Sequence, residues 1–104
     1  MDMGLTDKII LITGAASGIG LAIARAVAIE GVAGLILTDR DANGLANTGL
    51  AMTGLDVLNV TADLTDSDTP EMLLTAARNH FGRLDGLINA AGLTTRASLT
   101  SGTP

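Results

Sequence analysis

Small residues gather at positions 13–20, Thr-Gly-Ala-Ala-Ser-Gly-Ile-Gly, where an apolar run gives way to a helical pattern. Glycine permits a tight turn and lets a ligand approach the backbone closely. The free N–H groups and the dipole at the start of a helix attract anions. The chemistry that this segment could perform is therefore binding of a pyrophosphate, and the alternative is an ordinary strand-to-helix turn.

A carboxylate, Asp39, ends the next apolar run, about twenty residues further along the chain. A carboxylate at such a position can accept hydrogen bonds from both ribose hydroxyls of a dinucleotide and would repel a 2′-phosphate. Its neighbour Arg40 could attract that phosphate, so the pair favours NAD over NADP without deciding between them. The alternative for Asp39 is a role as a helix N-cap.

The composition of the 104 residues points to one small globular domain with a small-molecule partner. Hydrophobic residues make up 47% and charged residues 16%, which is too apolar for intrinsic disorder. The net charge of -5, with six scattered Lys and Arg, argues against nucleic acid or an anionic membrane as a partner. With no cysteine and the single histidine His80, we expect no metal site. No export signal opens the sequence, so we expect a cytoplasmic location.

Short apolar runs alternate with helical patterns along the chain. The runs that have the composition of buried strands span residues 9–13, 35–38, 57–60 and 84–89. Helical patterns start near residues 18, 41 and 69. Gly31 and Gly82 supply the stop signals of the first and third patterns. This alternation predicts parallel β-α-β units, in which helices cover a parallel sheet.

Each helical pattern has a face that we expect to pack on the sheet. In the first pattern this face comprises Ile19, Ala22, Ile23, Ala26 and Val27. In the second it comprises Ala42, Leu45, Ala46 and Leu50. The third opens with Thr69 as N-cap and Pro70 in its first turn, and its face comprises Leu73, Ala76, Ala77 and His80. Glycine costs about 1 kcal/mol against alanine in a helix interior, so Gly44 and Gly49 predict that the second helix frays.

The glycine spacing of residues 13–20 differs from the general Gly-x-Gly-x-x-Gly pattern and resembles that of the short-chain dehydrogenase/reductase family. Asp63-Leu64 after the third strand and residues 89–92, Asn-Ala-Ala-Gly, after the fourth resemble the same family. The resemblance runs from about Leu5 to Gly92. It implies a Rossmann-type, doubly wound parallel α/β sheet of about four strands in the order 3-2-1-4, truncated relative to the family, with the ligand between strands 1 and 4.

The family resemblance also implies roles for individual residues. The backbone that would hold the pyrophosphate is that of Gly14, Ser17, Gly18, Ile19 and Gly20. An acid at Asp39, with an uncharged residue at Ser17, selects NAD over NADP. The Asp63 carboxylate and the Leu64 backbone would contact the adenine, although Asp63 could instead only shape an Asx-turn. The residues that would border the cofactor ribose are Asn89, Ala91 and Gly92, whereas Ala90 departs from the family's asparagine at its position.

The active site of the family uses a Ser, a Tyr, a Lys four residues after the Tyr, and a further Asn. This sequence has no tyrosine, and its only lysine is Lys8, at the start of the first strand. We therefore assign no catalytic residue and expect residues 1–104 alone to be inactive. We interpret 1–92 as an NAD(P)-binding half-domain and 93–104 as a polar tail that leads into a missing catalytic half.

Three functions follow from this interpretation. The first is an NAD(P)-dependent oxidoreductase that transfers hydride between the nicotinamide and an alcohol or ketone, present here as its cofactor-binding part. The second is a non-catalytic NAD-binding module that needs a partner, and the third is a remnant that binds nothing. In each case the fourth strand leaves an apolar sheet edge, which predicts association, most simply as a homo-oligomer.

Overall fold

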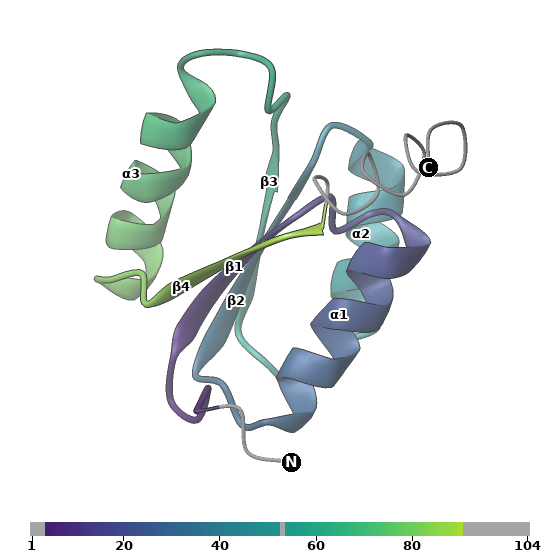
Figure 1. The fold of residues 1–104 in the computed structure, drawn as a ribbon, viewed down its shortest axis with the longest axis vertical. Helices are drawn as coiled ribbons and strands as arrows, with labels where there is room; N and C mark the ends of the chain where they lie inside the picture. Colours follow the sequence, from purple (N-terminus) through teal and green to yellow (C-terminus); the bar gives the residue numbers. More distant parts are fainter. Residues whose placement is uncertain (1–3, 53, 91–104) are drawn as a thin grey trace, which may run out of the picture.

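The computed structural model describes residues 4–52 and 54–90, in which strands and helices alternate as the sequence predicts. The strands are β1 (Ile9–Thr13), β2 (Gly34–Asp39), β3 (Val57–Thr61) and β4 (Gly86–Asn89). The helices are α1 (Gly18–Ile29), α2 (Ala42–Leu50) and α3 (Thr69–Phe81). The strands form one parallel sheet in the order β3-β2-β1-β4, which confirms the predicted order. Figure 1 shows α1 and α2 on one face of the sheet and α3 on the other.

The register of the sheet brings the carboxyl ends of the strands together. Thr13 of β1 pairs with Thr38 on one side and with Asn89 on the other, and Asp39 pairs with Thr61. Parallel strands run in one direction, so the residues that follow all of them lie along one edge of the sheet. The loop after β1 and the polar residues after β2, β3 and β4 are thus neighbours in space, as the binding-site prediction requires.

The sheet is covered by apolar side chains on both faces, and every residue of β1 is buried. Successive side chains of a strand point to opposite faces, which divides the core in two. The residues that form the core beneath α1 and α2 include Ile10, Ile12, Leu35, Leu37, Ala24, Val27 and Leu45. The residues that form the core beneath α3 are Ile9, Leu11, Ile36, Leu73 and Ala77. Continuous apolar runs are therefore the correct pattern for these central strands.

The predicted packing face of α1 is correct at Val27 and partly at Ile23, but not at its other positions. The buried residues of this helix are Gly20, Ala24 and Val27, whereas Ile19 is 41% exposed and Ala22 and Ala26 are also exposed. The cause lies at Gly20, which contacts the backbone of the preceding loop. That contact places Gly20 on the buried face of α1, together with Ala24 and Val27.

Helix α2 packs through small residues that hydrophobicity alone does not identify. Its buried residues are Leu45 and Thr48, whereas Leu50 is 78% exposed, so the predicted face is correct only at Leu45. A Cβ atom at Gly44 would lie 2.9 Å from the Ala16 Cβ, and one at Gly49 would lie 2.7 Å from the Asn59 side-chain amide. These two glycines lower helix propensity, but they let α2 lie close to the loop after β1 and to β3.

Helix α3 begins one position away from the predicted cap. Its N-cap is Asp68, and Thr69 is instead buried, with its hydroxyl donating to the Asp63 carbonyl at 2.6 Å. Gly82, at φ 84°, ends the helix as predicted. Leu73 and Ala77 pack on the sheet as expected, while His80 lies at the surface within 2.9 Å of Asp56. The next strand begins at Gly86 rather than at residue 84.

The Asp85 carboxylate joins the start of β1 to the segment before β4. Its Oδ2 accepts hydrogen bonds from the Ile9 N–H at 2.8 Å and from the Arg83 Nε at 2.9 Å. The Ile9 N–H holds the pKa of Asp85 below its ordinary value, with help from Arg83 and Lys8. A carboxyl whose folded pKa is lowered stabilises the fold above its ordinary pKa, and this stabilisation disappears as the pH falls through the lowered value.

We expect Asp85→Asn to lower the melting temperature at pH 7, because an amide carries no charge to hold the Ile9 N–H and Arg83. At a pH below the lowered pKa of Asp85 the wild-type carboxyl also becomes neutral, so the melting temperatures of the two proteins should converge there. Circular dichroism melts at both pH values measure this, with Asp68→Asn as control because Asp68 makes no capping hydrogen bond. An equal difference in melting temperature between wild type and Asp85→Asn at both pH values would contradict the explanation.

Candidate dinucleotide-binding site

The loop after β1 closes on itself through Ser17. Gly14 has a φ of 67°, a conformation that favours glycine, and turns the chain away from the strand. Ser17 caps α1: its Oγ accepts from the Gly20 N–H at 2.9 Å and donates to the Gly14 carbonyl at 2.7 Å. One serine hydroxyl therefore stabilises both the loop at Gly14 and the first turn of α1.

Gly20 and Gly18 have different reasons to be glycine. A Cβ atom on Gly20 would lie 2.1 Å from the Gly14 carbonyl oxygen and 2.7 Å from the Ala15 Cα, so no side chain fits there. A Cβ atom on Gly18 would meet nothing within 4 Å. Gly20 is thus required by the packing of the loop on α1, whereas the protein itself leaves the space beside Gly18 open.

The start of α1 offers backbone donors. The Gly18 and Ile19 N–H groups occupy the first positions of the helix and have no hydrogen-bond partner among the described residues. The positive end of the helix dipole lies at the same point. Two free amides beside an open space suit an anion, so this part of the chain fits a pyrophosphate.

Asp39 faces the same loop from the end of β2. Its Oδ2 accepts from the Ala16 N–H at 3.0 Å, and its Oδ1 accepts from the Asp41 N–H at 3.0 Å. The N-cap of α2 is Asp41, which bonds the Gly44 N–H, so the alternative reading of Asp39 as an N-cap is wrong. A carboxylate has further lone pairs on each oxygen, and Asp39 can still accept hydrogen bonds from ribose hydroxyls.

Asp63 forms the Asx-turn that the sequence offered as its alternative role. Its Oδ1 accepts from both the N–H of Thr65 at 2.9 Å and the Thr65 hydroxyl at 2.7 Å. These hydrogen bonds lower the pKa of Asp63, and the positive charge of Arg40 lowers it further. The charge of Arg40 therefore acts on the Asp63 carboxylate. Leu64 beside it is 41% exposed, so the segment presents both a carboxylate and apolar surface.

At the opposite side of β1, Asn89 joins the two strands that border the predicted crevice. Its Oδ1 accepts from the Thr13 hydroxyl at 2.7 Å. Ala90, where the sequence departs from the family's asparagine, is fully buried in the same apolar cluster as Ile12 and Ala15. The predicted site residues Ala91 and Gly92 lie outside the described residues.

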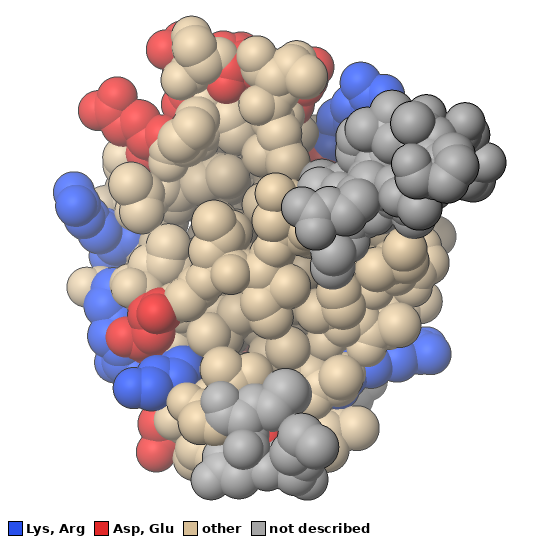
Figure 2. Space-filling model, viewed as in Figure 1, with Lys and Arg blue, Asp and Glu red and all other residues tan. Residues whose placement is uncertain are grey.

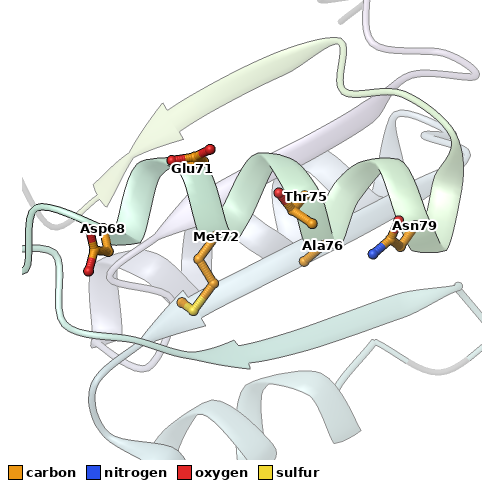
Figure 3. Close-up of a pocket in the computed structure, with 6 residues that line it drawn as sticks. All are labelled: Asp68, Glu71, Met72, Thr75, Ala76 and Asn79. Carbon is orange, nitrogen blue, oxygen red and sulfur yellow. The ribbon is translucent and has the colours of Figure 1, made fainter.

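Among the other described residues, charge and surface shape indicate no second dinucleotide site. Acidic residues gather near the start of α3, and the basic residues in Figure 2 lie at the margins of the visible face, most of them on its left side. Figure 3 shows a groove whose lining residues all come from α3 and its N-cap, and none is a predicted site residue. Within residues 4–52 and 54–90, no helix is long and apolar enough to cross a bilayer, and no three metal-ligating side chains cluster.

Comparison with known proteins agrees with this geometry. The family model described as short chain dehydrogenase matches residues 8–103. The chain belongs to the short-chain dehydrogenase family. One curated member, levodione reductase of Leifsonia aquatica, is 40% identical over 92 residues, which are 85% of this chain and 34% of that protein.

Solved structures of the family have the same fold. L-sorbose reductase from Gluconobacter frateurii, complexed with NADPH and L-sorbose, superposes with a TM-score of 0.76 at 36% identity and covers 84% of this chain. A short-chain dehydrogenase/reductase from Burkholderia phymatum in complex with NAD gives 0.75 at 34% identity and covers 80%. The chain spans 34% and 30% of these two proteins, about a third of each.

Sequence reasoning missed several residues that shape the site. Thr48 donates to the Ala15 carbonyl at 2.8 Å, Gly44 lies against Ala16, and Thr65 holds Asp63. Gly44 and Thr48 are four residues apart on one helix, which puts two small residues on one face. This spacing is the only sequence signal that indicates their contact with the loop.

Proposed function

We propose that residues 1–104 bind NAD as the cofactor-binding part of an oxidoreductase of the short-chain dehydrogenase family. The observation that carries the proposal is the juxtaposition of two features at one edge of the sheet. The free N–H groups of Gly18 and Ile19 begin α1, and the Asp39 carboxylate bonds the Ala16 N–H of the same loop. An anion-binding helix terminus beside a carboxylate matches the pyrophosphate and the ribose of a dinucleotide.

Each predicted residue has a part in this binding. The loop backbone from Gly14 to Gly20 holds the pyrophosphate, and Asp39 accepts the hydroxyls of the adenosine ribose. Asp63 and Leu64 contact the adenine, and Asn89 borders the second ribose together with residues 91 and 92. The bound nicotinamide would accept hydride from an alcohol or donate it to a ketone.

NAD rather than NADP is proposed because of the charge at Asp39. Two negative charges about 4 Å apart repel by about 4 kcal/mol at the effective dielectric constant near a protein surface. Arg40 offers a positive charge nearby, but its charge also acts on Asp63, whose pKa is lowered mainly by the Thr65 hydrogen bonds and further by Arg40. The solved relatives bind NADPH in one case and NAD in the other, so the preference is a property to measure on this chain.

Proton transfer is not proposed for these residues. The tyrosine that family resemblance leads us to expect as the acid/base is absent from the sequence, and the only lysine, Lys8, precedes β1 at the edge opposite the glycine loop. We therefore propose binding without turnover for residues 1–104, with 1–92 forming the binding unit. We also propose a cytoplasmic location for the protein.

Isothermal titration of the folded chain tests the proposal. We expect NADH to bind with a Kd at least roughly tenfold below that of NADPH, which corresponds to about 1.4 kcal/mol. A folded chain that binds neither nucleotide at millimolar concentration would leave only the remnant hypothesis, and tighter binding of NADPH would overturn the proposed preference.

The alternative function, a non-catalytic NAD-binding module, is distinguished by the mass of the protein that the source cells make. A mass near 10.4 kDa with NADH binding would favour the module. A mass more than twice that would favour the front part of a complete oxidoreductase, whose serine, tyrosine and lysine would then be sought downstream.

Association is expected at the β4 edge. Within the described sheet β4 pairs only with β1, and Leu87 is 61% exposed. An open strand edge with an apolar side chain pairs readily with another chain, and a charged residue suppresses this. We expect the chain to self-associate in light scattering and Leu87→Lys to become monomeric. Leu50→Lys, which changes an exposed leucine of α2, should not, and a wild-type monomer would contradict the expectation.

A further inference from the structure

One peptide group of the glycine loop is held from both sides. The carbonyl of Ala15 and the N–H of Ala16 belong to the same peptide group. The Thr48 hydroxyl donates to that carbonyl at 2.8 Å, and the Asp39 Oδ2 accepts from that N–H at 3.0 Å. The two partners come from different elements, α2 and the end of β2, so the peptide is clamped between them.

The Thr48 bond is unusual for a threonine within a helix. Such a hydroxyl ordinarily bonds the carbonyl four residues earlier in its own helix. Thr48 does contact the Gly44 carbonyl at 3.2 Å, but its shorter bond reaches out of the helix to the loop. Thr48 is 2% exposed and Ala15 is fully buried, so water does not replace this bond when it is lost.

Gly44 brings α2 close enough for this bond. A Cβ atom at Gly44 would lie 2.9 Å from the Ala16 Cβ and 2.7 Å from an Asp41 carboxylate oxygen. The Asp41 side chain could rotate away only by giving up its capping bond to the Gly44 N–H, and the Ala16 Cβ moves only with the loop. A glycine and a threonine on one face of α2 therefore form the contact of this helix with the loop, on the face of the sheet that α1 and α2 share (Figure 1).

We propose that Thr48 is a positioning residue for dinucleotide binding, acting through the clamped Ala15–Ala16 peptide. The orientation of this peptide determines how the chain enters Ser17 and hence the direction of the Gly18 and Ile19 N–H groups. Asp39 belongs both to the clamp and to the proposed ribose contact, so ribose binding and loop orientation are linked through one carboxylate. This inference rests on the proposed function, because its affinity readout uses NADH.

The test compares Thr48→Val with Thr48→Ser. Valine has the shape of threonine without the hydroxyl, and we expect the Kd for NADH to rise roughly tenfold or more. Serine keeps the hydroxyl and should bind within about threefold of wild type. Thr38→Val is the matched control, because Thr38 is also buried and its hydroxyl donates to the Val60 carbonyl at 2.7 Å, while its backbone carbonyl, which accepts from the Ala15 N–H at 3.1 Å, is kept in the variant. Thr38→Val should lower the stability of the fold without a comparable rise in the Kd for NADH.

A second readout needs no nucleotide. Hydrogen exchange of the Ala16 amide should accelerate in Thr48→Val but not in Thr48→Ser, because an unclamped peptide no longer holds its N–H against Asp39. If Thr48→Val does not fold, Gly44→Ala replaces it: alanine favours the helix but crowds Ala16, so NADH binding should weaken while α2 remains helical.

The outcomes separate this proposal from the proposed function. A folded wild type that does not bind NADH counts against NAD binding, and the Ala16 exchange then still tests the clamp. Unchanged affinity and unchanged Ala16 exchange in folded Thr48→Val overturn the clamp, as does equal weakening in Thr48→Val, Thr48→Ser and Thr38→Val.

Discussion

Gly20→Ala is expected to remove NADH binding and to destabilise the chain. A Cβ atom there would lie 2.1 Å from the Gly14 carbonyl oxygen, against backbone that belongs to the binding loop itself. Overpacking of this kind costs about 1–3 kcal/mol of stability. The loop can relieve the contact only by moving away from α1, and the loss of the loop conformation should weaken NADH by roughly 100-fold, about 2.8 kcal/mol.

Gly18→Ala is the matched comparison. A Cβ at Gly18 meets nothing within 4 Å, and the residue lies in the first turn of α1, so its stability should be unchanged or slightly higher. If the pyrophosphate lies beside this glycine, the added methyl should still weaken NADH. Titration calorimetry and thermal melts of both variants separate the two effects. Wild-type affinity in folded Gly20→Ala would contradict the role assigned to the loop.

Asp39→Asn is expected to change the cofactor preference. An amide oxygen can still accept the Ala16 N–H, which Asp39 now holds at 3.0 Å, but the charge that repels a 2′-phosphate disappears. The ratio of NADPH to NADH affinity should therefore rise by roughly 10–100-fold, or about 1.4–2.8 kcal/mol. Part of this gain should come from Arg40, which would then face the phosphate without the Asp39 carboxylate beside it.

The ratio of the two affinities is the informative quantity, because any damage to the loop lowers both. Asp41→Asn is the control: Asp41 is also a carboxylate at this end of the sheet, but its side chain caps α2. It should leave the ratio within about threefold of wild type, since aspartate and asparagine are similar N-caps. A ratio unchanged in Asp39→Asn would show that Asp39 does not select the cofactor.

The sheet could be predicted from the sequence because its signals are local and strong. The run of residues 9–13 is apolar throughout, and in the structure all five residues of β1 are buried between two layers of helices. The strand order β3-β2-β1-β4 followed from family resemblance rather than from residue patterns, and the structure confirms it. The positions of Asp39, Asp63 and Asn89 after successive strands then bring them to one edge.

Part of the packing of α1 and α2 could not be predicted, because hydrophobicity does not identify contacts made by small residues. Gly20 is buried because it packs on the backbone of the loop, and Thr48 is buried because its hydroxyl has a partner more than thirty residues away in the chain. In the sequence, Gly44 and Gly49 indicate only a weak helix. In the structure they let α2 approach the glycine loop and β3 closely. Such a contact depends on the fold and cannot be predicted from the local sequence.

The most direct test of the account is a ¹⁵N–¹H correlation spectrum of the chain titrated with NAD. We predict that the largest changes fall on the amides of the loop and of the strand ends, above all Gly18, Ile19, Asp39, Asp63 and Asn89. Changes confined to the outer groove of α3, such as at Met72 and Ala76, or no change in a folded chain, would contradict dinucleotide binding at the carboxyl edge of the sheet.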